Sequence, residues 1–297
     1  MLSSARLVAV GVFALVLWTP ICTSAVTIKG QFLGGQSLGP TFGGGNIDTI
    51  FRAAASAWEQ AIRDDFTVTL NYGWGSSPGG THRLLVQGGS PNRELVGEIR
   101  VNAQVFTDGS FVQLFLDPTP FTNEEFTTFS DRTQDFGGGA VNVERRYSGA
   151  DGISVPLFQD LFSIMAHEIG HGLGISNANT SFITEAADVN ITVTGPLPFA
   201  GTTIPLATNN FGVTSHFDSS ITGPVMTGLF FNDRQLPSDL DILANVQLSG
   251  FRNPNLQTVP EPHTLLLLAS GLAVLLLGNV VAGRRGYGID SPPTDRP

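Results

Sequence analysis

Apolar residues recur at helical spacing in two stretches of the chain. In residues 47–63 they fall three or four positions apart, on one face of an amphipathic helix: Ile50, Phe51, Ala54, Trp58 and Ile62. In residues 238–247 a serine suited to the N-cap is followed three positions later by an acid, and Gly250 then ends the pattern. The pattern therefore predicts a helix near each end of the central part of the chain.

Between these helices the hydrophobic pattern changes to that of β-strands. Residues 66–72 (FTVTLNY) alternate apolar and polar side chains and are rich in β-branched residues. Glycine, proline and aspartate turns, with a loop at 137–139, separate this segment from the other predicted strands, at 84–86, 95–102, 111–116 and 188–194. The order of helix, strands, helix, long loop and helix predicts an α+β domain with a small twisted sheet.

A third helix is predicted from residue 156 to about residue 172. Its apolar residues form one stripe that would face the core: Phe158, Leu161, Phe162, Met165, Ile169 and Leu173. A second stripe carries His167 and His171, which lie one helical turn apart, with Glu168 beside them. Gly174 follows and lets the chain leave the helix sharply.

The first 25 residues have the order of a secretory signal peptide. Arg6 precedes an apolar run at 7–18, and Pro20 and several small residues follow up to Ala25. The run holds about 12 residues, fewer than the ~20 that a membrane-spanning helix needs. We therefore expect export and cleavage after Ala25, which also removes Cys22, the one cysteine of the chain.

A second apolar run lies at 265–282, near the C-terminus. As a helix it would span ~27 Å, close to the hydrocarbon thickness of a bilayer, and Arg284 and Arg285 behind it favour a cytoplasmic tail. Residues 259–262 (VPEP) precede it. The order of Pro-Glu-Pro, apolar helix and arginine cluster resembles the PEP-CTERM sorting signal of Gram-negative bacteria. The resemblance implies an exosortase partner, transient anchoring in the inner membrane, and release to the cell surface or outside the cell.

These signals leave residues 26–258 as one domain. It lies between a signal peptide at 1–25 and a sorting signal at 259–285, which a polar tail at 286–297 follows. A domain of this length can bury a proper core. The formal net charge of the chain is −10, and the sequence lacks the basic face that a nucleic-acid partner requires. The charge argues against nucleic acid as a partner.

The helix predicted at 156–172 carries the pattern His167-Glu168-x-x-His171. Two imidazoles one turn apart can reach a single metal ion. Neutral imidazole suits Zn²⁺, and a catalytic zinc typically takes three protein ligands and a water. Glu168 lies too far round the helix to be a good ligand and is placed to take a proton from that water. The pattern predicts a zinc site with Glu168 as general base.

The third ligand is not where the longer motif H-E-x-x-H-x-x-G-x-x-H would place it, because Asn177 occupies that position. His263 lies in the sorting signal, and His82 lies far upstream in a glycine-rich turn. His216 remains. We expect it to be the third ligand, with Asn177 a bystander, since imidazole binds zinc better than a neutral amide does.

Carboxylates remain alternatives to His216. Glu185 lies fourteen residues after His171, as in a thermolysin-like arrangement, and Asp188 or Asp218 could also ligate. If His216 is the ligand, we expect Asp218 to support the site through hydrogen bonds or to be a solvated acid.

Met226 follows His216 by ten residues, in a turn rich in glycine and proline. A histidine after a long insertion, followed by such a turn, resembles the leishmanolysin-like branch of the metzincins, and the helix at 238–247 matches the layout of that family. The resemblance implies a single zincin-like domain with an active-site helix and a C-terminal helix. It also implies roles for individual residues: zinc binding for His167, His171 and His216, acid–base catalysis for Glu168, a hydrophobic floor under the metal for Met226, and the turn after the active-site helix for Gly174.

Together these motifs predict a secreted zinc metalloendopeptidase with protein or peptide substrates. One alternative is a non-catalytic, zinc-stabilised protein of the cell surface or extracellular matrix, and another is a zinc hydrolase that acts on a different bond. Glu168 favours the metalloendopeptidase over the non-catalytic protein. A structural zinc site needs no general base and usually fills all four positions with protein ligands.

Overall fold

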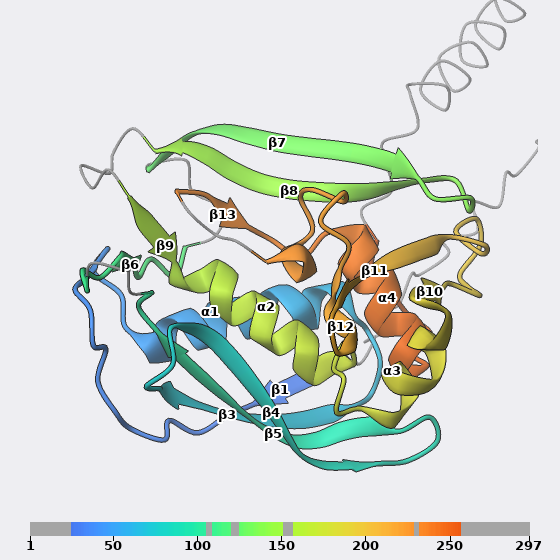
Figure 1. Cartoon of the computed structure of the whole chain (residues 1–297), viewed down its shortest axis with the longest axis horizontal. Helices are drawn as coiled ribbons and strands as arrows, with labels where there is room; N and C mark the ends of the chain where they lie inside the picture. Colours follow the sequence, from blue (N-terminus) through green and yellow to red (C-terminus); the bar gives the residue numbers. More distant parts are fainter. Residues whose placement is uncertain (1–24, 105–108, 120–124, 151–156, 229–231, 257–297) are drawn as a thin grey trace, which may run out of the picture.

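The computed structural model describes residues 25–104, 109–119, 125–150, 157–228 and 232–256 (Figure 1). The predicted sorting signal with His263, the polar tail and, apart from Ala25, the predicted signal peptide lie outside the described residues. Within the described ranges, no helix has the length and apolar character needed to cross a membrane. The described chain is a mixed α+β structure with four α-helices and four small sheets, in agreement with the predicted fold class.

The largest sheet has four strands in the order β1-β3-β5-β4. Their bounds are Thr27–Lys29 for β1, Thr67–Trp74 for β3, Arg93–Asn102 for β5 and Gly79–Gly88 for β4. β1, β3 and β5 run parallel, whereas β4 runs antiparallel to β5 at the edge of the sheet. Three predicted strands are confirmed here, since 66–72 matches β3, 84–86 lies in β4 and 95–102 matches β5.

Helices α1 (Ile47–Ala61) and α2 (Leu161–Leu173) lie side by side over this sheet (Figure 1). α1 confirms the first predicted helix and begins at Asn46, whose side chain and backbone both take part in a capping box. Trp58 of α1 is fully buried, and its Nε1 donates to the carbonyl oxygen of Ala166 in α2 at 2.9 Å. This hydrogen bond fixes the rotation of α2 relative to α1.

The helix that carries the HExxH pattern begins later than predicted. Strand β9 (Phe158–Asp160) occupies its expected first turn and pairs in parallel with β6 (Gln113–Phe115), which pairs with β2 (Thr41–Phe42). Asp160 then caps α2, because its carboxylate accepts the backbone N–H of Ser163 at 3.0 Å. The pattern missed β9 because its apolar first residue continues the stripe of the helix. The strand predicted at 111–116 is confirmed as β6.

A long hairpin that the hydrophobic pattern did not predict lies on the other side of α2 (Figure 1). β7 (Phe126–Asp135) and β8 (Ala140–Ala150) pair antiparallel around the predicted loop at 137–139, and β13 (Arg234–Gln235) pairs with β8. After its first residue, β7 has only exposed or half-buried side chains, so no apolar face marks it in the sequence. α2 therefore lies between two β-layers, and each of its residues is buried.

The long loop expected between the third and the last predicted helix contains regular structure instead. It contains one short helix, one 3-10 turn and a three-stranded antiparallel sheet: α3 (Thr180–Glu185), η1 (Ala186–Asp188), β10 (Asn190–Thr192), β11 (Thr203–Asn209) and β12 (Gly212–Phe217). β10 lies inside the strand predicted at 188–194. This compact unit returns the chain to α2 at His216.

The last described helix, α4 (Asp239–Ser249), confirms the prediction for 238–247. Ser238 and Asp241 form the expected capping box, and Gly250 ends the helix in the left-handed conformation with a φ of 59°. The 3-10 turn η2 (Val225–Thr227) lies beside the first turn of α4.

Candidate metal centre

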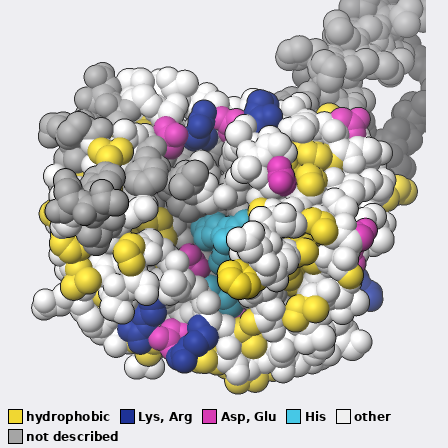
Figure 2. Space-filling model, in the orientation of Figure 1, with side chains coloured by type: hydrophobic (Ala, Val, Ile, Leu, Met, Phe, Trp, Pro, Cys, Tyr) yellow, Lys and Arg dark blue, Asp and Glu magenta, His cyan; other side chains and the backbone are white. Residues whose placement is uncertain are grey.

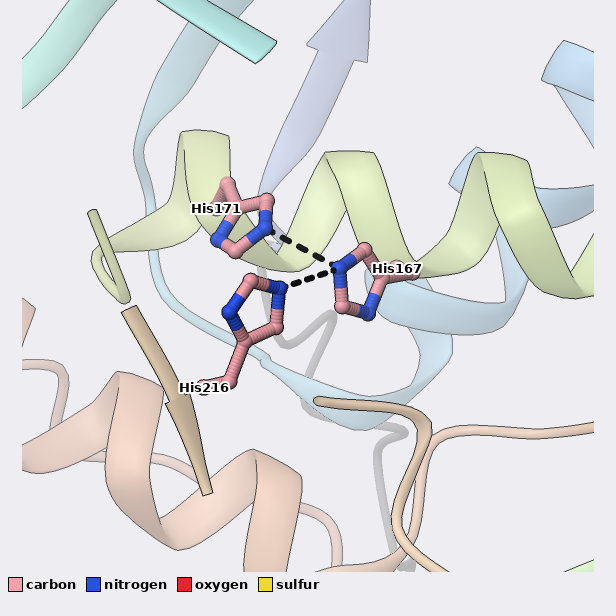
Figure 3. Close-up of side chains that lie close together, drawn as sticks. All are labelled: His167, His171 and His216. Atoms are coloured by element: carbon pink, nitrogen blue, oxygen red, sulfur yellow. Dashed lines mark hydrogen bonds between the residues drawn. The ribbon is translucent and has the colours of Figure 1, made fainter. Parts of the chain in front are cut away.

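Three histidines from two elements converge on one point (Figure 3). His167 and His171 lie one turn apart on α2, and His216 lies on β12. The Nε2 atoms of His167 and His171 are 3.0 Å apart, and those of His167 and His216 are 3.2 Å apart. The three potential ligand atoms all lie within 4.8 Å of one another. The structure thus brings together the three residues that the sequence analysis assigned as metal ligands.

Backbone carbonyls orient two of these rings. Nδ1 of His167 lies 2.7 Å from the carbonyl oxygen of Val225, and Nδ1 of His171 lies 2.5 Å from that of Ile175. Since a carbonyl oxygen can only accept, each Nδ1 carries the proton and each Nε2 presents a lone pair. Two lone pairs that face each other across 3.0 Å repel unless a cation lies between them. This arrangement is typical of metal-binding histidines.

Burial favours the neutral form of all three rings. Loss of solvent, assisted by the neighbouring His216, lowers the pKa of His167 to about 3. Burial also lowers the pKa of His171 well below its ordinary value and lowers the pKa of His216. Metal ions bind the neutral imidazole, so the three rings are in their ligating form at neutral pH.

The spacing of the nitrogens fits a tetrahedral ion. Zn–N bonds of about 2.0–2.1 Å at tetrahedral angles separate two nitrogens by about 3.3 Å, and the two observed separations are 3.0 and 3.2 Å. Three imidazoles leave the fourth position of such an ion to water or substrate. The residues present therefore fit one tetrahedral metal ion with an accessible fourth position.

The alternative ligands lie elsewhere. Glu185 accepts the backbone N–H of Thr192 at 3.0 Å, and Asp188 and Asp218 each accept a backbone N–H two residues further along the chain. Among the described residues, none of these three acids belongs to the group of converging ligand atoms. Asn177 is exposed in the turn after α2. The geometry therefore favours His216 over each of them.

A tight turn supports the histidines from the C-terminal part of the chain. η2 supplies the Val225 carbonyl that binds His167, and Met226 in the same turn is fully buried. A Cβ on Gly170 would overlap Sδ of Met226, so the methionine packs directly on the turn of α2 that carries both motif histidines. Met226 is thus a buried contact of the α2 segment between His167 and His171.

The N-terminus of α4 holds this turn in place. The carboxylate of Asp241 accepts the backbone N–H of Val225 at 3.1 Å and the hydroxyl of Ser238 at 2.6 Å. Asp241 is fully buried, and burial raises its pKa to about 6 although its hydrogen bonds oppose the rise. The sequence showed Asp241 only as a capping partner, because its second role depends on how α4 packs.

Glu168 is the acid beside the histidines. Its side chain is only 4% exposed, and within the described part of the chain its Oε2 has no hydrogen-bond partner. Burial raises its pKa to about 8. Its carboxyl group packs against Gly80 in β4. A buried carboxyl oxygen without a partner indicates a group that engages a ligand or exchanges a proton.

A further histidine–carboxylate pair lies next to the centre, and the sequence analysis missed it. His82 was expected in a glycine-rich turn, but it lies in β4, with Nε2 2.8 Å from Oε1 of Glu94 in β5. The ring centroids of His82 and His171 are 6.0 Å apart. Residues 81–83 are all polar, so no alternation of apolar and polar residues marked this part of β4, and the two glycines before it indicated a turn instead.

The centre lies in a hollow on the face shown in Figure 2, where histidine surface is visible below the surrounding rim. His167 and His171 are 6% and 7% exposed, and His216 is half-buried. The centre therefore contacts solvent, while most of the His167 and His171 rings stay packed.

The chain matches no protein-family model, no curated protein and no solved structure. Its function is therefore inferred from the chemistry of the three histidines and Glu168.

Proposed function

We propose that the protein is an exported, zinc-dependent metalloendopeptidase of the metzincin type. The observation that carries the proposal is the convergence of His167, His171 and His216 next to a buried carboxyl group, that of Glu168, on the same helix. Three neutral imidazoles with a fourth position left open form the ligand set of a catalytic site. A structural zinc usually has four protein ligands.

Zinc is the metal that these ligands suit best. Imidazole nitrogens favour zinc, copper, iron or nickel over calcium and magnesium, which prefer oxygen ligands. The near-tetrahedral spacing of the nitrogens supports zinc among the former group. When bound, zinc would activate water and polarise the substrate carbonyl as a Lewis acid.

In this proposal Glu168 moves the proton. Near a bound cation the Glu168 carboxyl group would ionise despite its burial-raised pKa. The carboxylate would then take a proton from the attacking water and return it to the nitrogen of the leaving amine. The carboxyl group is shielded from bulk solvent, since Glu168 is 4% exposed, and a low local dielectric strengthens such charge-dependent steps. The backbone carbonyl oxygen of Val225 holds His167 in the tautomer that can bind a metal, and that of Ile175 does the same for His171.

The position of β4 supports an extended peptide as substrate. β4 is the edge strand of the largest sheet and packs against α2. An edge strand presents a row of backbone donors and acceptors that an extended peptide can pair with. A peptide bound in this way would run past the histidine centre, which favours cleavage within a chain over removal of a terminal residue.

Other features of the fold support the metzincin type. Met226 lies in a buried turn against α2, Gly174 ends α2 with a φ of 154°, and α4 follows the turn. The segment between His171 and His216 is a folded insertion that delivers the third imidazole from β12. These are the features that the leishmanolysin-like ligand spacing implies.

The terminal segments support export followed by processing. The signal peptide at 1–25 and the PEP-CTERM-like order at 259–285 would make the secretion machinery and an exosortase partners of the chain, with a transient stay in the inner membrane. Intact-mass measurement of the native protein tests this part. A mature protein that still contains residues 265–282 would contradict it.

Metal analysis combined with digestion of an unbiased peptide library tests the enzymatic part. We expect about one zinc ion per chain and internal peptide cleavage that a chelator abolishes and added zinc restores. Zinc without cleavage of any peptide would favour the non-catalytic surface or matrix protein. Cleavage confined to ester or other bonds would favour a different zinc hydrolase.

A further inference from the structure

Gly80 lies where strand β4 passes the carboxyl group of Glu168. A Cβ at position 80 would overlap Oε1 of Glu168 and would lie 2.8 Å from its Cδ and 2.9 Å from its Cγ. Real Cβ atoms essentially never come this close to another heavy atom. The backbone of Gly80 is therefore the surface on which the Glu168 carboxyl group rests.

The conformation of Gly80 does not by itself require glycine. Its neighbour Gly79 has a φ of 78°, whereas Gly80 is not among the glycines with positive φ. Gly80 also pairs with Val101 in the regular antiparallel register of β4 and β5. An alanine could adopt this backbone. The space that its methyl group needs is the space that Glu168 occupies.

We infer that Gly80 is a positioning residue for Glu168, an inference that rests on the proposed role of Glu168 as general base. Pairing with β5 fixes the backbone of β4, and the missing side chain lets the carboxyl group lie directly on it. Contact with Gly80 holds Oε1 on the sheet side.

Substitution of Gly80 by alanine tests the inference. To relieve the overlap, the carboxyl group must move by about 1 Å, a displacement that can cost about 10²-fold in rate. We expect kcat to fall about 10- to 100-fold, with metal content and melting temperature close to those of the wild-type protein. If KM or metal content changes while kcat does not, the role of Gly80 lies elsewhere.

Gly88→Ala is the matched control. Gly88 lies on the same strand, is likewise not among the glycines with positive φ, and a Cβ there would meet only Cδ1 of the exposed Leu95, at 3.3 Å. We expect this variant to keep its kcat within about twofold, because the end of a flexible side chain can give way. Equal activities of Gly80→Ala and Gly88→Ala would overturn the inference.

Glu168→Asp shows whether Gly80→Ala lowers kcat through contact with the Glu168 carboxyl group or by disturbing β4 in general. Aspartate is one methylene shorter, so its carboxyl group is withdrawn from Gly80. In this background we expect Gly80→Ala to cost less than about threefold in kcat, because residues in contact have non-additive effects. The same fold loss in both backgrounds would show that Gly80 acts independently of Glu168.

Crystal structures of the wild-type protein and the Gly80→Ala variant give a readout that does not depend on activity. The inference requires the Glu168 carboxyl group to shift by about 1 Å in the variant, with the three histidines unmoved. If the carboxyl group stays in place, Gly80 does not position it. If the wild-type protein cleaves no peptide at all, the proposed function fails, while the structures still decide whether Gly80 positions Glu168.

Discussion

The carboxylate of Asp241 accepts the backbone N–H of Met226 at 3.0 Å, and so ties the first turn of α4 to the turn beside the histidines. The same carboxylate accepts the N–H of Val225, whose carbonyl oxygen orients His167. One buried acid therefore connects α4 to the face of α2 that carries His167. Helix capping and ligand orientation depend on the same side chain.

Asp241→Asn is expected to weaken both metal binding and the fold. The amide keeps one acceptor oxygen, but its NH₂ group faces N–H and O–H donors that the carboxylate accepted. A buried donor left without an acceptor lowers the stability of the fold by about 1–3 kcal/mol. We also expect metal affinity to fall about 10-fold, as for other groups that orient a ligand. Denaturant unfolding and chelator competition measure the two effects.

Asp188→Asn is the control for that variant. Asp188 is exposed, and its carboxylate accepts only a local backbone N–H, that of Asn190. We expect no change in metal affinity. If Asp241→Asn also left the metal affinity unchanged, the hydrogen bonds from Asp241 to Val225 and from Val225 to His167 would not contribute to metal binding.

Glu168→Gln is expected to separate metal binding from catalysis. Glutamine has nearly the same shape as glutamate but cannot accept the proton, so we expect near-normal zinc content and a loss of peptide cleavage of ~10²-fold or more. Metal analysis and a fluorogenic peptide assay on the same preparation provide both values. Comparable turnover in the variant would point to another base or to a contaminating peptidase.

The helices of this fold were readable from sequence because their signals are local. The apolar stripe of α1, and Ser238, Asp241 and Gly250 around α4, act within a few residues. The β7–β8 hairpin was not predicted, since β7 has only one fully buried residue, Phe126. A strand of this kind is stabilised by its pairing partner, which a single-sequence pattern does not contain.

The histidine centre was predictable in its chemistry but not in its surroundings. HExxH spacing pointed to His167, His171 and Glu168, and the preference of zinc for imidazole pointed to His216; the structure brings the three histidines together. That Gly80 and His82 lie beside Glu168 and His171 follows from the register of β4, which begins earlier than the predicted strand. Register depends on long-range pairing, so the sequence placed both residues in a turn.

The hydrogen bond between Tyr72 and Asp48 predicts a pH dependence at the alkaline end. The Tyr72 hydroxyl donates to Oδ1 of Asp48 at 2.8 Å, and burial together with this bond raises the pKa of Tyr72 from 10.0 to about 12. The pKa in the folded protein is above that in the unfolded chain. The contribution of Tyr72 to stability is therefore fully present below pH 10 and is lost as the pH rises toward 12.

Asp48→Asn tests this dependence, because it removes the negative charge and keeps an acceptor oxygen. We expect the Tyr72 phenolate to form at lower pH in the variant, as measured by ultraviolet absorbance. The loss of stability should also begin at lower pH. Identical titration curves for the two proteins would mean that Asp48 has no part in the raised pKa.

His216→Ala is expected to lower metal affinity and abolish peptide cleavage, because it removes the nitrogen that lies 3.2 Å from Nε2 of His167. Two imidazoles alone leave a tetrahedral ion with half of its positions unfilled by protein. Asn177→Ala and Glu185→Ala serve as controls. Asn177 is exposed, and the Glu185 carboxylate accepts the backbone N–H of Thr192 instead of joining the histidines. Both controls should keep one metal ion per chain and wild-type cleavage. If His216→Ala kept full metal and activity while Glu185→Ala lost both, the thermolysin-like ligand arrangement would be correct and the metzincin assignment wrong.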